Sequence, residues 1–87
     1  MISFKERELM AVKSSELKVN QPILITDILG SESIRLRLME AGFTPDTEIT
    51  LTSRLPFGGP LTFRCHGTKI AIRAEDAQFI LGQYAYN

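Results

Sequence analysis

The chain has 87 residues, of which 44% are hydrophobic and 23% charged, and its ten basic side chains balance its ten acidic ones. This composition excludes a disordered tail. The zero net charge argues against a nucleic-acid-binding module, whose affinity comes largely from a basic surface. No apolar run approaches the ~18 residues of a membrane span. A charged N-terminus without the apolar stretch of a signal peptide, together with a single cysteine, predicts a domain that stays in the reducing cytosol.

Residues 1–13 are expected to form a separate helical extension. Ser3 and Glu6 have the spacing of a capping box, and an apolar stripe follows them. A helix of about ten residues is marginal on its own, so we expect it to dock or to fray. Residues 14–87 are expected to form one domain.

That domain opens with a strand and a helix. The apolar run 23–28 predicts the first strand. Ser31 or Ser33 can cap a helix with an apolar stripe that runs to Ala41. Gly42 is suited to end this helix in the left-handed conformation, which side chains disfavour.

Three segments then alternate apolar and polar side chains, which predicts strands with one face in the core; they are residues 48–52, 61–66 and 69–73. A two-residue loop containing Gly67 joins the last two and predicts a type II′ hairpin. A helical turn at residues 75–77 and a short strand around residues 79–81 follow. The last strand, with Tyr84 and Tyr86 beyond it, either completes the fold or pairs with a second copy.

The fold class follows from these short strands, because two large sheets cannot be built from so few residues. We predict a mainly β fold: a small SH3-like β-barrel of about five strands, with one helix inserted after the first strand and a short N-terminal helix. Closure of the sheet into a barrel would leave few exposed edges.

The residues that could carry catalysis are few. Cys65 and His66 are the only thiol and the only imidazole, and consecutive residues of a strand point to opposite faces. A metal cage needs three or four convergent ligands, so we expect no metal site and no cofactor, beyond weak surface binding at His66. Pro60 follows the glycine pair and lacks the N–H that a phosphate cradle would use. The chain is therefore expected not to be an enzyme.

The connection between the second and third strands is the unusual segment. Such a connection lies at the surface, yet this one carries two large apolar side chains stiffened by two prolines. Either Phe57 folds back and plugs one end of the barrel, or the loop docks on a protein partner. The candidate partner-binding residues here are Arg54, Leu55, Pro56, Phe57, Gly58, Gly59 and Pro60.

Arg35 and Arg37 on the polar face of the helix have a similar ambiguity. Arginines on such a face are commonly solvated, but arginine is also enriched at protein interfaces. Both residues are kept as candidate partner-binding residues.

Several short motifs follow one another at characteristic spacing: Ser15–Lys18, Arg37–Thr47, Pro56–Pro60, Gly67–Arg73 and then Ala77 and Ile80. In this order and spacing they resemble the FeoA family of small SH3-like accessory proteins of bacterial ferrous iron transport. The resemblance covers about residues 14–86. Two turns depart from the family pattern, with Asn20 and Asp46 at positions where glycine is common, and both residue types tolerate turn geometry.

The resemblance implies a non-enzymatic cytosolic protein that binds the cytosolic side of FeoB, a membrane ferrous iron transporter with a GTP-binding domain. There it would modulate the nucleotide cycle or the gate, and FeoB could recruit it to the inner membrane. One alternative stays open: the family also resembles the C-terminal SH3-like domain of iron-dependent repressors, so this chain could act in trans with such a repressor. A proline-rich peptide ligand is disfavoured because the aromatic residues are scattered along the chain.

Overall fold

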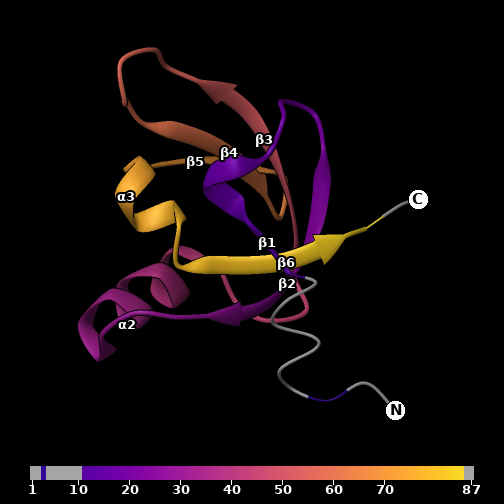
Figure 1. Ribbon diagram of the computed structural model, residues 1–87, viewed down its shortest axis with the longest axis vertical. Coiled ribbons are helices and arrows are strands. Elements are labelled where there is room, and N and C mark those ends of the chain that lie inside the picture. Colours follow the sequence, from indigo (N-terminus) through magenta and orange to yellow (C-terminus); the bar gives the residue numbers. More distant parts are fainter. Residues whose placement is uncertain (1–2, 4–10, 86–87) are drawn as a thin grey trace.

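The computed structural model describes residue 3 and residues 11–85. These residues form a six-stranded antiparallel sheet in the order β1-β6-β2-β3-β4-β5, with three short helical segments. The elements are β1 (Val12–Lys13), the 3-10 helix η1 (Ser14–Glu16), β2 (Pro22–Ile28), α2 (Glu32–Ala41), β3 (Glu48–Arg54), β4 (Leu61–Cys65), β5 (Thr68–Ile72), α3 (Ala74–Ala77) and β6 (Ile80–Tyr84). Figure 1 shows the sheet wrapping around one interior, with α2 below it.

Two β-bulges curl the sheet, one in β2 at Thr26 and one in β3 at Thr52. At each bulge the threonine hydroxyl donates to a carbonyl oxygen of the neighbouring strand, over 3.4 Å to Leu81 and 3.1 Å to Thr62. A bulge bends its strand and increases the local twist. In the described part of the chain, the end strands β1 and β5 do not pair with each other, so hydrogen bonds do not close the curled sheet into a barrel.

The core lies inside the curl. The alternating side chains of β3 and β4 face it as predicted, and the rings of Phe43 and Phe63 meet edge to face with their centroids 5.9 Å apart. The buried apolar residues are Leu17, Ile23, Ile25, Ile28, Leu38, Phe43, Ile49, Leu51, Leu61, Phe63, Cys65, Ala77, Ile80 and Leu81.

Helix α2 begins and ends as predicted. The Ser31 hydroxyl accepts a hydrogen bond from the Ile34 backbone N–H, and Gly42 ends the helix with a φ of 115°. Leu38 is its buried residue, but Ala41, which we placed on the apolar stripe, is exposed. No helix among residues 11–85 is long and apolar enough to cross a membrane.

The mainly β fold class is confirmed, with six strands rather than about five. The additional strand is β1, whose Val12 and Lys13 we had placed in the helical extension and which instead pair with β6. The other residues expected in that helix, apart from Ser3 and Ala11, lie outside the described part of the chain. The last strand is Ile80–Tyr84 rather than 79–81, and it completes the sheet by lying between β1 and β2.

The tight turns use residues other than glycine in left-handed conformations. Asn20 and Asp46, the two departures from the family pattern, have φ values of 71° and 69°. The β4–β5 loop is His66-Gly67, with φ values of 52° and 76°. Positive φ at both central residues is the type I′ geometry, so the predicted type II′ turn is wrong.

One close backbone approach inside the sheet depends on glycine. Gly82 lies opposite both Val12 and Ile25, and a Cβ at this position would lie 2.5 Å from the Leu24 carbonyl oxygen. Because a backbone atom blocks the space, β6 or β2 would have to move to admit any side chain.

We therefore expect Gly82→Ala to lower the free energy of unfolding by about 1–3 kcal/mol, the usual cost of overpacking. Urea denaturation followed by circular dichroism measures this. The matched control is Gln83→Ala, on the next and exposed residue of β6, which should change stability by less than about 0.5 kcal/mol. Equal stability of the two variants would contradict this explanation of Gly82.

Candidate partner-binding surface

The loop between β3 and β4 is a pre-formed turn. The Gly59 N–H donates to the Pro56 carbonyl oxygen at 3.2 Å, and the Leu55 N–H donates to the Pro60 carbonyl oxygen at 3.2 Å. Gly59 is needed for this closure, because a Cβ there would lie 2.9 Å from the Leu55 Cβ. The loop is thus held by one backbone hydrogen bond at its base and by a second across the turn at its tip.

Phe57 occupies the tip of this turn. Its φ is 60° and that of Gly58 is 72°, so both central residues have the type I′ conformation that favours Asn and Gly. A left-handed backbone costs a residue with a side chain about 1–2 kcal/mol. Strain of this kind persists only where the surrounding structure holds the residue in place.

The Phe57 side chain projects fully into solvent, with a relative exposure of 103%. Of the two alternatives open at the sequence level, folding back into the core is therefore wrong. Leu55 is also exposed, at 54%, and Pro56 and Pro60 are exposed beside it. Together these residues form an exposed apolar tip, and Phe57 is the most exposed of the large hydrophobic side chains in the described part of the chain.

Arg54 has a structural role at the start of the loop. Its Nη2 donates to the Leu17 carbonyl oxygen at 2.7 Å, so the guanidinium ties the start of the loop to the segment that precedes β2. This role was not visible in the sequence, because the two residues are 37 positions apart.

Arg35 and Arg37 are both exposed on α2. Arg35 lines a shallow hollow on the outer side of the helix with Glu32, Leu36 and Met39. The Arg37 Nη2 lies 3.9 Å from a carboxylate oxygen of Asp76 in α3, at the limit of an ion pair. Neither arginine reaches the loop.

The candidate residues therefore fall into two groups that lie far apart. In Figure 1 the β3–β4 loop is at the top of the molecule and α2 is at the bottom. A single partner domain of modest size would meet one group or the other, so the two groups do not form one continuous docking surface.

The side chains of Cys65 and His66, the thiol and the imidazole considered for catalysis, point to different surroundings, as predicted. Cys65 is buried, and its Sγ donates to the Gly42 carbonyl oxygen at 3.3 Å, whereas His66 is exposed in the β4–β5 turn. Burial raises the pKa of the Cys65 thiol. Within the described residues, no group of three or more His, Cys, Asp or Glu side chains gathers where it could hold a metal ion.

Comparison with protein families gives a match to the FeoA domain over residues 15–83. Comparison with curated protein sequences gives no match.

Solved structures with this fold include an iron uptake regulatory protein, FeoA, at 27% identity and a TM-score of 0.78, covering 85% of this chain and 97% of that one. FeoA of Stenotrophomonas maltophilia, solved with zinc, has 25% identity and a TM-score of 0.68, covering 83% of this chain and 89% of that one. It is described as a procaryotic SH3 domain protein and a candidate activating factor of bacterial ferrous iron transport. These likenesses confirm the SH3-like fold class.

A manganese-dependent transcriptional repressor has the same fold at a TM-score of 0.78, with 13% identity, covering 85% of this chain and 41% of that one. At this identity the likeness is one of fold alone. It gives no support of its own to a regulatory function.

Because the Phe57 ring is fully exposed, we expect Phe57→Ala to change the free energy of unfolding by less than about 0.5 kcal/mol. The comparison variant Phe63→Ala, at a fully buried ring, should lose about 3–5 kcal/mol. Urea denaturation of both variants checks this. A loss of stability in Phe57→Ala like that of Phe63→Ala would mean that the ring packs against the protein in solution.

The buried thiol should react only when the fold opens. Because Cys65 is buried and burial raises the pKa of its thiol, we expect alkylation of the native protein near pH 8 to be at least about tenfold slower than in urea. Equal rates in native and urea-unfolded protein would contradict the burial of this thiol.

Proposed function

Since the FeoA domain match covers residues 15–83, the chain belongs to the FeoA family, and we propose that it is a non-enzymatic accessory protein of bacterial ferrous iron uptake. It acts in the cytosol on the membrane transporter FeoB, at the cytosolic GTP-binding domain. The description of the related Stenotrophomonas maltophilia protein as a candidate activating factor of ferrous iron transport supports this role. The iron is the cargo of the transporter in this proposal, not a cofactor of this chain.

The contact with FeoB is made by the apolar tip of the β3–β4 loop. The observation that carries this assignment is the fully exposed Phe57 ring on a turn with a strained backbone. Burying a phenylalanine side chain in a partner's pocket contributes about 2–3 kcal/mol. Because the turn is already closed by backbone hydrogen bonds, little conformational entropy is lost on binding.

Binding can alter the transporter only if it distinguishes two of its states. A ligand shifts an equilibrium by the difference between its affinities for the two states. The pocket that receives Phe57 must therefore change with the bound nucleotide or with the position of the gate. This protein then biases the nucleotide cycle or the gate without chemistry of its own.

Arg35 and Arg37 lie outside the contact with FeoB in this proposal. They lie on α2, at the opposite end of the molecule from the loop (Figure 1), and Arg37 is already close to Asp76. An arginine on that helix is therefore a well-matched control for the loop.

Titration of the purified FeoB cytosolic domain with this protein tests the proposal. We expect Phe57→Ala to weaken binding by at least about 2 kcal/mol, or thirtyfold in Kd, as for an aromatic hot spot. Arg37→Ala should change Kd by less than about twofold.

Wild-type and Phe57→Ala proteins of equal affinity would contradict the role of the loop. Loss of binding in Arg37→Ala alone would place the contact on α2 instead. No binding by the wild-type protein in any nucleotide state would contradict the partnership itself.

A further inference from the structure

Strand β5 leaves one long side of the sheet open. It pairs with β4 along its whole length, and no backbone hydrogen bond from the described residues engages its other side. The sheet's opposite end is β1, which is only two residues long. Unpaired N–H and C=O groups of an edge strand are a template for a further strand.

A like-charge pair lies beside this open edge. Arg64 in β4 is directly opposite Lys69 in β5, so the two cationic side chains share one face of the sheet. Like charges in this arrangement destabilise a sheet. Neither side chain forms an ion pair within the described part of the chain. Glu48, an acidic residue two positions from Thr50 on β3, lies on the far side of β4 from the edge.

The inward-facing side chains of β5 are incompletely covered. Ile70 and Ile72 pack against the core but stay partly exposed, and Ala71 between them is exposed. The edge therefore offers apolar surface on the inner side and positive charge on the outer side.

We propose that β5 accepts an extended acidic segment of a partner protein as an additional strand. Main-chain hydrogen bonds to the open edge supply the general affinity, as in other cases of strand addition. Alternating side chains supply the specificity, with a carboxylate beside Lys69 and small apolar groups over Ile70 and Ile72. An acidic strand also relieves the repulsion between the two cations.

The charge pattern argues for this occupant over two others. Two copies of β5 placed edge to edge would bring two like-charged Lys69 side chains onto one short strand pair, and a lysine on an edge strand is a common device against such pairing. Nucleic acid is disfavoured because the protein has zero net charge, whereas such binding draws its affinity largely from excess positive charge.

This surface is separate from the loop that we assign to FeoB. The like-charged pair lies near the β4–β5 turn, whereas the loop joins the other end of β4. The inference therefore does not rest on the proposed function, and failure of the loop experiment leaves it standing.

The test is a titration of the full chain with a short blocked peptide in which glutamate alternates with valine, read by amide hydrogen exchange. We expect exchange of β5 backbone amides to slow at least about tenfold on saturation. Lys69→Glu should weaken binding by at least about tenfold and, at the same time, raise the thermal midpoint of the free protein, because it converts a repulsive pair into an attractive one. If Lys69 had only a structural role, its replacement would not weaken peptide binding while raising the thermal midpoint.

The matched controls are Lys18→Glu, the same charge change at another exposed lysine, and Phe57→Ala. Both should bind the peptide within about twofold of the wild type. The proposal is overturned by no binding at millimolar peptide, by unchanged exchange in β5, or by equal binding of the matching lysine–valine peptide. Tighter binding of a single-stranded oligonucleotide than of the acidic peptide would also overturn it.

Discussion

The edge-to-face contact of Phe43 and Phe63, at an interplanar angle of 82°, lies at the centre of the curled sheet. Around it, the alternating side chains of β2, β3, β4 and β6 fill the interior, and the described residues leave no buried side-chain polar atom without a hydrogen bond. A chain of this size can build one such core and little else. Recognition therefore has to use the exterior of the sheet and its loops.

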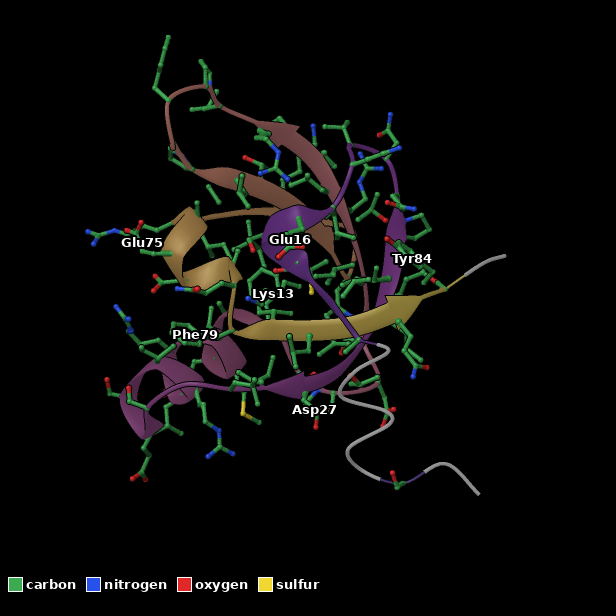
Figure 2. All side chains as sticks on the ribbon, in the orientation of Figure 1. Lys13, Glu16, Asp27, Glu75, Phe79 and Tyr84 are labelled. Carbon is green, nitrogen blue, oxygen red and sulfur yellow. The ribbon has the colours of Figure 1, made fainter. Side chains whose placement is uncertain are left out.

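The curl of the sheet around this core also determines how far the β3–β4 loop lies from α2. The bulges at Thr26 and Thr52 bend β2 and β3, so the β3–β4 loop projects at one end of the molecule while α2 lies at the other (Figure 1). Figure 2 shows charged side chains such as Glu75 directed outward from the short helix α3, between these ends. A partner that takes the Phe57 loop thus leaves α2 and the β5 edge free for other contacts.

Much of the fold could be predicted because its signals are local. Ser31 caps the start of α2 and Gly42 ends it, each through backbone groups close by in the sequence. The alternation of apolar and polar residues in β4 was enough to predict that Cys65 lies in the core. The type of the β4–β5 turn was predicted wrongly because it depends on the register in which β4 and β5 pair. Strand β1 was missed because two residues, Val12 and Lys13, are too few to show a periodic pattern and become a strand only by pairing with β6. The candidate site was predicted as a set of residues but not as a surface.

The sequence could not decide whether the Phe57 side chain packs into the core or points into solvent, because an apolar residue between two prolines is compatible with either position. In the structure the Phe57 side chain points into solvent, and we propose that this exposure serves recognition of FeoB. The most direct measurement is the amide chemical-shift map of the isotopically labelled protein on addition of the FeoB cytosolic domain. We expect shifts concentrated at residues 54–60 and the adjoining ends of β3 and β4. Shifts confined to α2, with residues 54–60 unchanged, would contradict it.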